Sequence, residues 1–162
     1  MSRQPQVAVS GGGADPGAEV LQAAEEVGRR LAEASVTLVC GGRGGVMEAA
    51  ARGAAGAGGE VIGILPGTDP AEANEHCTCV IATGTGHARN LAVVASADAV
   101  IAIAGEWGTL SEIAYARRLG RPVVTLGSWE VKGTGAMENA PGIEPADGPA
   151  AAVAAALKHM PG

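Results

Sequence analysis

Glycine-rich segments are the first feature of this sequence whose residue types could do chemistry. Ser10-Gly11-Gly12-Gly13, Gly41-Gly42-Arg43-Gly44-Gly45 and Gly105-Glu106-Trp107-Gly108-Thr109 each follow an apolar run and precede a segment with helical patterning. A glycine loop at a helix N-terminus can bind phosphate, because backbone N–H groups approach the anion closely and the helix dipole favours negative charge. The pattern predicts a site for a small phosphorylated ligand. The alternative is structural, since any fold that alternates strands and helices uses glycine turns.

Two common nucleotide-binding patterns are missing from these loops. The chain has two lysines, Lys132 and Lys158, and neither stands in a glycine loop, so the P-loop pattern is absent. The dinucleotide pattern G-x-G-x-x-G fails after the first apolar run, because Pro16 takes the place of its last glycine. A standard ATPase or dinucleotide dehydrogenase is therefore disfavoured.

Two arginines stand where they could contact an anion. Arg89 opens a helical segment within Gly84-Thr85-Gly86-His87-Ala88-Arg89-Asn90, and Arg43 lies inside the second glycine loop. A guanidinium offers a bidentate fork to phosphate or carboxylate. The alternative for each is a surface pair with a neighbouring acid. His87 is expected to face solvent.

Glu112 has two competing interpretations. Thr109-Leu110-Ser111-Glu112 matches a capping box, in which the glutamate reaches back to the first backbone N–H of its helix. The functional alternative places its carboxylate beside the phosphate site, where it would hold a ribose hydroxyl or stabilise an oxocarbenium-like centre.

Trp107 and the cysteines are less specific signals. A large aromatic within a glycine turn either stacks on a base or pterin ring, or packs in a subunit interface. Cys77-x-Cys79, next to His76, is half of a metal site at most, so core or edge cysteines are expected and no metal is predicted.

The elements that must position these residues alternate along the chain. Strands are predicted over Gln6 to Ser10, Val36 to Cys40, Glu60 to Leu65, Cys79 to Thr83, Ala97 to Ala104 and Pro122 to Leu126. Helices are predicted over Gly17–Ala34, Gly44–Ala57, His87–Ser96, Thr109–Leu119 and Pro149–His159. A long surface loop or flap is expected over Gly127 to Asp147.

This alternation predicts the fold class. Most strands are apolar on both faces, as in a parallel sheet covered on both sides. We therefore expect an α/β fold, a single-domain Rossmann-like doubly wound parallel sheet with helices on both faces, spanning residues 1–162. Such sheets bind ligands at the carboxyl ends of their strands, where strand order reverses. The loops at Gly41–Gly45 and Gly105–Thr109 should therefore bracket one anion site.

Composition limits the classes of partner. The 162 residues carry a net charge of −6 without a basic stripe, so a nucleic acid polymer is not an expected partner. No segment has the roughly 18 apolar residues of a membrane helix, and the N-terminus lacks a signal-peptide core. Three cysteines suit a reducing compartment, so a cytoplasmic protein is expected. Ala-rich helices with few aromatics predict a homodimer or homotetramer, with the Thr109–Leu119 helix or its neighbour at the interface.

Four motifs together resemble the LOG-like (SLOG) Rossmann superfamily over roughly residues 6 to 126. They are Gly41-Gly42-Arg43-Gly44-Gly45-Val46-Met47-Glu48, Gly63-Ile64-Leu65-Pro66-Gly67, Gly86-His87-Ala88-Arg89-Asn90 and Gly105-Glu106-Trp107-Gly108-Thr109-Leu110-Ser111-Glu112. In the LOG branch, the resemblance implies hydrolysis of nucleoside 5′-monophosphates to base and ribose 5-phosphate, with Glu112 and Arg89 as catalytic residues. The chain departs from that branch at Ala104-Gly105-Glu106, which replaces Pro-Gly-Gly, and at Gly86 and Asn90, which replace Met and Lys.

A second branch, the molybdenum cofactor carrier proteins, is closer in motif. Gly42 to Glu48, Ala88-Arg89-Asn90 and Ser96-Ala97-Asp98-Ala99-Val100-Ile101 are similar to that branch. The resemblance implies reversible binding of a pterin monophosphate, with the molybdenum cofactor as a carried ligand and no cofactor required for activity. The expected binding residues are Gly11, Gly12, Gly41, Gly42, Arg43, Gly44, Gly45, Arg89, Gly105, Gly108, Thr109 and Glu112.

Overall fold

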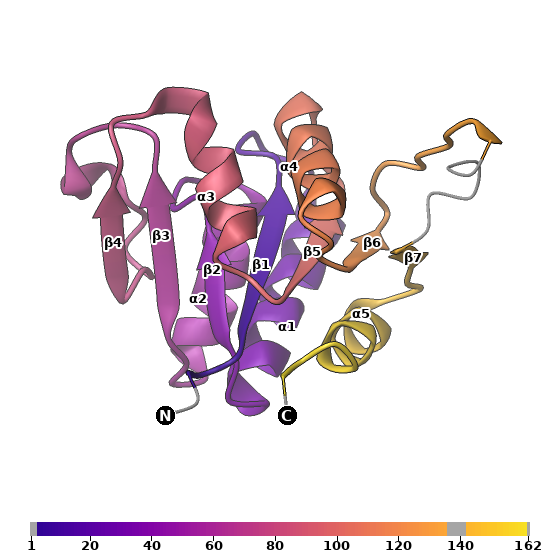
Figure 1. Cartoon of the computed structure of the whole chain (residues 1–162). Helices are drawn as coiled ribbons and strands as arrows, with labels where there is room; N and C mark the ends of the chain where they lie inside the picture. Colours follow the sequence, from indigo (N-terminus) through magenta and orange to yellow (C-terminus); the bar gives the residue numbers. More distant parts are fainter. Residues whose placement is uncertain (1–2, 136–141, 162) are drawn as a thin grey trace.

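One parallel sheet forms the centre of the molecule. The computed structural model describes residues 3–135 and 142–161. Within them the sheet has seven strands in the order β4-β3-β2-β1-β5-β6-β7, and every neighbouring pair is parallel (Figure 1). The strands are β1 (Gln6–Gly11), β2 (Thr37–Cys40), β3 (Val61–Leu65), β4 (Cys79–Ala82), β5 (Ala99–Ile103), β6 (Val123–Leu126) and β7 (Ile143–Pro145).

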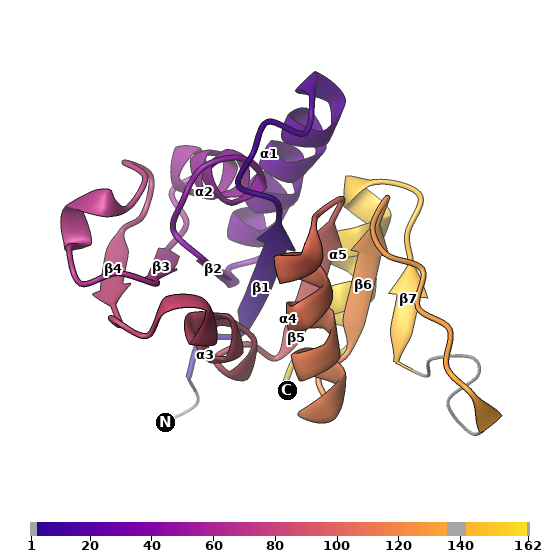
Figure 2. The ribbon, with the colours of Figure 1, turned by 90° about the horizontal axis from the view of Figure 1, so that it is seen from above.

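Helices cover both faces of this sheet. The face that carries α1 (Ala18–Glu33), α2 (Val46–Gly56) and α5 (Pro149–Leu157) is opposite the face that carries α3 (Arg89–Ala95) and α4 (Trp107–Arg118), as Figure 2 shows from above. Two short 3₁₀ turns, η1 (Pro70–Glu72) and η2 (Gly86–Ala88), lie in the connections around β4. The predicted doubly wound, Rossmann-like α/β fold is confirmed.

The central strands are buried because helices shield both of their sides. Every residue of β2 and β5 is buried, and one apolar cluster lies on each face of the sheet. On one face, α1 and α2 cross with their backbones in close contact. A Cβ added at Gly28 would lie 1.9 Å from the carbonyl oxygen of Ala50, and one at Gly53 would lie 1.9 Å from that of Glu25. These two glycines allow Ala-rich helices to pack tightly without large side chains.

The order of the strands reverses between β1 and β5. The chain runs outward from β1 to β4 and then returns to the other side of β1 with β5. The carboxyl ends of these two central strands therefore lie side by side, with chain segments leaving them in opposite directions. In sheets of this kind ligands bind at that point.

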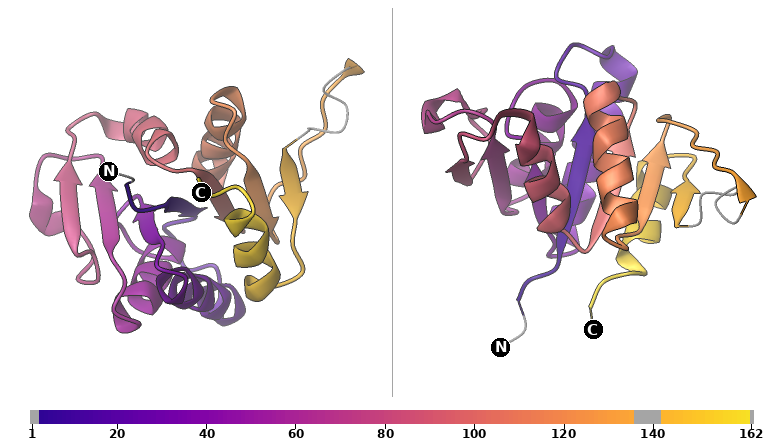
Figure 3. Two further views of the ribbon diagram at one scale, coloured as in Figure 1. Left: turned by 60° about the horizontal axis from the view of Figure 1, so that its bottom comes forward. Right: turned by 45° about the horizontal axis from the view of Figure 1, so that its top comes forward.

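The predicted long loop at 127–147 is wrong in part. Ile143–Pro145 forms β7, which pairs with β6 at the sheet edge, while residues 136–141 of that predicted loop lie outside the described residues. The described part at 127–135 extends away from the sheet edge (Figures 1 and 3). So short a strand shows no alternation, and Pro145 is compatible with it because an edge strand has an unpaired side.

No helix within the described residues is both long and apolar enough to cross a membrane.

Candidate functional site

A cavity of about 250 Å³ lies at the carboxyl ends of the central strands, where strand order reverses. It is bordered by the loops that follow β1, β2 and β5 and by the start of α3. Eight of the twelve predicted binding residues line it: Gly11, Gly12, Gly41, Arg43, Arg89, Gly108, Thr109 and Glu112. The loops at 41–45 and 105–109 thus converge on one cavity, whereas the binding of an anion there remains a prediction.

Helices α2 and α4, which follow two of these loops, begin without a side-chain cap. The N-cap residue of α2 is Gly45, which has no side chain, and that of α4 is Glu106, whose side chain accepts no hydrogen bond from its helix. The first-turn N–H groups of a helix have no partner within the helix and carry partial positive charge. The two starts therefore bring partial positive charge to the carboxyl edge of the sheet, where the Val46 N–H of α2 already donates to the carbonyl oxygen of Gly12 at 3.1 Å.

Four predicted residues, Gly42, Gly44, Gly45 and Gly105, do not line the cavity. Two of them shape its loops instead. Gly45 has φ 66°, and a Cβ there would lie 2.3 Å from the carbonyl oxygen of Gly12. Gly105 has φ 104°, and a Cβ there would lie 2.3 Å from the Thr109 hydroxyl oxygen. Both positions need glycine for backbone conformation and close packing.

Two arginines of the described residues line this cavity, and of these Arg89 is half-buried whereas Arg43 is exposed. One Nη1 hydrogen bond, 3.0 Å long, goes to the carbonyl oxygen of Ile64, and its other N–H groups bond to no protein atom in the described part of the chain. Burial lowers the pKa of Arg89, while the negative charge of Glu112 raises it. A Cβ at Gly41 would lie 1.8 Å from Arg89 Nη1, so Gly41 provides the space that the guanidinium occupies.

Arg43 lines the cavity but has another partner. Its Nη1 lies 2.6 Å from Oε2 of Glu72, which belongs to η1, and both side chains are about half exposed. The surface-pair interpretation of Arg43 therefore describes its contact in this structure. Its part in ligand binding remains a prediction.

Glu112 is buried beside the cavity, with 7% of its surface exposed. Burial raises its pKa to about 7, although the hydrogen bond from Ser10 and the positive charge of Arg89 act in the opposite direction. Ser10 Oγ donates that hydrogen bond to Glu112 Oε2. A carboxyl group with such a pKa can hold or release a proton near neutral pH.

The capping-box interpretation of Glu112 is wrong. Helix α4 begins at Trp107 with Glu106 as its N-cap, so Thr109 already lies within the first turn. Glu112 therefore stands beyond the position from which a side chain could cap the helix start, and it contacts β1 instead. The error came from placing the helix start two residues late.

Sequence reasoning missed several residues that line the cavity. Ser10, Met47, Asn90 and Glu106 belong to this set, and His87, which was expected to face solvent, is exposed and also borders the cavity. Asn90 Nδ2 donates to Ser111 Oγ at 3.2 Å and so connects α3 to α4. Ser10 was detectable in principle, because a polar residue that ends a buried strand needs a partner.

Trp107 lies at the start of α4, between the cavity-lining residues Glu106 and Gly108. It is 76% exposed. Its ring centroid lies 5.1 Å from that of Trp129, at an interplanar angle of 38°. Trp129 Nε1 donates to the carbonyl oxygen of Glu106 at 3.1 Å, which fixes the second indole next to the first. Ring stacking and subunit contact both stay predictions for Trp107.

Metal ligands do not gather anywhere in the described residues: no group of three or more His, Cys, Asp or Glu side chains there could hold an ion. Cys79 is exposed on β4, and Cys77 packs against the apolar cluster that contains Cys40. The core-or-edge interpretation therefore describes both residues of the Cys77-x-Cys79 pair.

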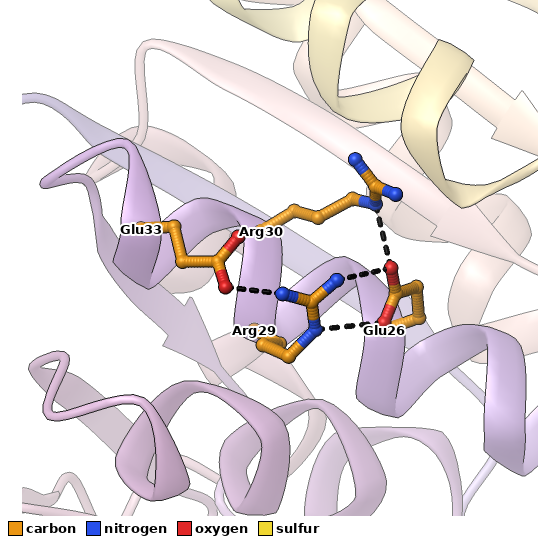
Figure 4. Close-up of polar contacts among 4 residues, drawn as sticks. All are labelled: Glu26, Arg29, Arg30 and Glu33. Atoms are coloured by element: carbon orange, nitrogen blue, oxygen red, sulfur yellow. Dashed lines mark hydrogen bonds and ion pairs between the residues drawn. The ribbon is translucent and has the colours of Figure 1, made fainter.

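A larger hollow, of about 990 Å³, lies over α1 and α2. Most of its charged side chains are already paired with one another. Arg29 lies 2.6 Å from Glu26 (Figure 4), and Arg52 lies 2.9 Å from Glu25. The hydrogen bond from Arg29 is the main cause that lowers the pKa of Glu26 to about 2. These mutual pairs leave less charge for a ligand than the carboxyl-edge cavity offers.

Comparisons with known sequences cover most of the chain. The SLOG cluster4 family model matches residues 4–153. An uncharacterized protein of Archaeoglobus fulgidus is 45% identical over 108 residues, which is 67% of this chain and 71% of that protein. A probable cytokinin riboside 5′-monophosphate phosphoribohydrolase of Oryza sativa is 38% identical over 106 residues, which is 62% of this chain and 43% of that protein.

Solved structures extend the similarity to nearly the whole length. The molybdenum cofactor binding protein of Rippkaea orientalis superposes with a TM-score of 0.86 at 30% identity, covering 98% of each chain. The molybdenum cofactor carrier protein of Chlamydomonas reinhardtii gives 0.83 at 32% identity, covering 97% of this chain and 98% of that one. DNA processing protein A of Helicobacter pylori gives 0.70 at 18% identity, over 97% of this chain and 82% of that one, and shares the fold alone.

Proposed function

The chain belongs to the SLOG cluster4 family, and from that premise we propose that it reversibly binds a small phosphorylated, nucleotide-like ligand of the molybdenum cofactor type. The observation that carries this proposal is the cavity at the carboxyl edge, where three glycine loops and Arg89 meet. Loop amides and a guanidinium are donors without acceptor capacity, which suits an oxyanion. The similarity to molybdenum cofactor binding and carrier proteins over nearly the full length of both chains supports the same ligand class.

In this proposal the residues of the cavity have different roles in binding the ligand. The loop amides around Gly11, Gly12 and Gly41 and the first turn of α4 at Gly108 and Thr109 bind the phosphate. The guanidinium of Arg89 supplies paired hydrogen-bond donors and the positive charge. Gly45 and Gly105 act indirectly, because they shape the loops without lining the cavity, whereas Gly42 and Gly44 lie in the second loop outside the cavity lining. Arg43 would have to leave Glu72 to contact a ligand.

Ligand binding without catalysis is favoured because the carrier proteins are similar to more of this chain than the probable phosphoribohydrolase is. The carrier proteins superpose on 97–98% of this chain, whereas the sequence match to the probable phosphoribohydrolase covers 62% of it and leaves more than half of that protein outside the match. Glu106 also adds a carboxylate to the cavity at the position where the hydrolase motif has glycine. Reversible binding requires no bond cleavage, so the loops and Arg89 suffice for it.

One observation favours a second candidate, a nucleoside 5′-monophosphate phosphoribohydrolase. The buried carboxyl of Glu112 borders the same cavity, and its pKa of about 7 suits proton transfer at neutral pH. Hydrolysis would break the N-glycosidic bond and add water, giving a free base and ribose 5-phosphate. Glu112 would then stabilise the positive charge that develops on the sugar, with Ser10 as its positioning partner.

Calorimetric titration with AMP and with a pterin phosphate, beside a chromatographic assay for released base, separates the two candidates. The carrier proposal expects binding without base release, and Glu112→Gln should still bind. Base release that Glu112→Gln abolishes would instead establish the hydrolase. Arg89→Ala should weaken binding by about 1.5–3 kcal/mol, since it removes a charge-assisted contact, while Arg89→Lys keeps the charge without the fork. Wild-type protein that binds neither ligand would contradict both candidates.

The organisation of the molecule completes the proposal. We treat residues 1–162 as one ligand-binding domain that assembles into a homodimer or homotetramer. A nucleic acid polymer is not a proposed partner, because the net charge is −6 and five arginines of the described residues are in ion pairs with acids.

A further inference from the structure

Two cysteines from distant parts of the sequence meet beneath the second glycine loop. Cys40 ends β2, and its register partner on β3 is Gly63. Partners in neighbouring parallel strands share a face of the sheet and lie roughly 4.8 Å apart. The sulfur of Cys77 lies 2.6 Å from the place that a Cβ on Gly63 would occupy. Because Gly63 has no side chain, Cys77 fills that space next to the side chain of Cys40.

The two thiols differ in access and in acidity. Cys40 is fully buried and Cys77 is half-buried. A hydrogen bond from Cys40 lowers the pKa of the Cys77 thiol, and the same bond together with burial raises the pKa of Cys40. Cys77 is therefore both the more accessible sulfur and the one that reaches the nucleophilic thiolate form more readily.

The segment that carries Cys77 also supports the glycine loop. The Asn74 backbone N–H donates to the carbonyl oxygen of Gly42 at 2.8 Å, and Asn74 Nδ2 donates to that of Arg43 at 3.0 Å. Asn74 Oδ1 accepts a hydrogen bond from the backbone N–H of His76 at 3.1 Å. Any bond that fixes Cys77 therefore also restrains the support of the Gly42–Arg43 loop.

We propose that Cys40 and Cys77 are an oxidation site, at which hydrogen peroxide forms a reversible intramolecular disulfide that fixes residues 74–77 against the Gly42–Arg43 loop. The Cys77 thiol ionises, its thiolate attacks one peroxide oxygen and the O–O bond breaks, and the departing hydroxide takes up the proton released by that ionisation to form water. The sulfenic acid on Cys77 is then attacked by the Cys40 sulfur. The S–O bond breaks, and the hydroxyl leaves as water with the Cys40 proton. In total, two thiols lose two electrons and two protons, while one peroxide is reduced to two waters.

Cys79 provides the matched control, because it is exposed and lies two residues from Cys77. The inference does not depend on what the cavity binds. Thiol titration and peptide mapping under non-reducing conditions should be carried out after peroxide treatment of wild type, Cys77→Ser and Cys79→Ser. Wild type should fall from three titratable thiols to one, with a linked pair of peptides that contain Cys40 and Cys77. Cys79→Ser should form the same link, and a reductant should reverse it.

Hydrogen exchange on the same samples tests whether the disulfide fixes residues 74–77 against the Gly42–Arg43 loop. Oxidation should slow the exchange of amides in residues 74–77 in wild type and Cys79→Ser. Cys77→Ser, first shown by thermal melting to be folded, should be unchanged by peroxide, which also controls for methionine oxidation. Three titratable thiols after treatment, or a link between Cys77 and Cys79, would overturn the disulfide. A Cys40–Cys77 link without slower exchange would overturn its effect on the loop.

Discussion

Glu112 determines how much negative charge the cavity carries near neutral pH. Because burial raises the pKa of this carboxyl group to about 7, it is mostly protonated at pH 6 and mostly ionised at pH 8. An ionised carboxylate repels an anion in the same cavity, whereas the protonated form does not. The single change Glu112→Gln keeps the size of the side chain and removes the titration.

We therefore expect anion affinity to depend on pH through Glu112. Sulfate is the suitable probe, because its own charge is constant across this range. Calorimetry on wild type should show sulfate affinity falling several-fold from pH 6 to pH 8, while Glu112→Gln should show little change. Glu144→Gln, a change at an exposed residue of β7, is the matched control and should follow wild type. Identical pH profiles in wild type and Glu112→Gln would contradict this role.

The same carboxyl group should affect folding stability with a definite sign. Its pKa rises from the ordinary glutamate value of 4.5 to about 7 in the fold, so between these values the folded state binds more protons than the unfolded state. Stability attributable to Glu112 is therefore full below about pH 4.5, falls as pH rises to about 7, and is constant above that. The fall amounts to about 3 kcal/mol. Urea unfolding at pH 5 and pH 8 should show this loss in wild type and not in Glu112→Gln; equal losses would contradict it.

At the level of the loops, substitutions at two glycines of the same loop are expected to have opposite effects on anion binding. A Cβ at Gly41 would lie 1.8 Å from Arg89 Nη1, whereas the nearest atom to a Cβ at Gly44 is 3.6 Å away. Gly41→Ala should displace the guanidinium and weaken sulfate binding about as much as Arg89→Ala does. Gly44→Ala should bind as wild type does. Calorimetry on both variants checks the pair, and unaltered binding in Gly41→Ala would show that the position of Arg89 is unimportant.

The start of α4 carries a prediction about the ring of the ligand. Trp107 is exposed and is flanked by two residues that line the cavity. If its indole stacks on the heterocycle, Trp107→Ala should weaken AMP binding by roughly 0.5–1.5 kcal/mol and leave ribose 5-phosphate binding unchanged. Quenching of tryptophan fluorescence by AMP should accompany binding in wild type. An unchanged AMP affinity, together with a smaller assembly, would assign Trp107 to a subunit contact instead.

The sequence predicted some elements well for physical reasons. Runs rich in β-branched and other apolar residues, such as Val36 to Cys40, mark strands buried on both faces, and glycine loops after them mark the carboxyl edge. Other features depend on contacts that spacing does not encode. The partner of Glu112 is Ser10, which is 102 positions away, and the partner of Arg43 is Glu72. β7 was missed because three residues at a sheet edge show no periodicity.

At the scale of the whole molecule, the prediction concerns the number of subunits in the assembly. Within the described residues, Ile81, Leu91, Trp107, Tyr115 and Leu119 are large apolar side chains left exposed. Three of these lie on α4 or at its end, which is consistent with the predicted interface at that helix or its neighbour. Light scattering at micromolar concentration should therefore report a dimer or tetramer. A monomer would contradict the prediction.

The central claim is that the carboxyl-edge cavity holds the phosphate of a nucleotide-like ligand, and a crystal structure of the protein grown with AMP tests it most directly. The account predicts phosphate density among the loops at Gly11–Gly12, Gly41 and Gly108–Thr109, within hydrogen-bonding distance of Arg89. Phosphate density in the hollow over α1 and α2, with the carboxyl-edge cavity free of ligand, would contradict it.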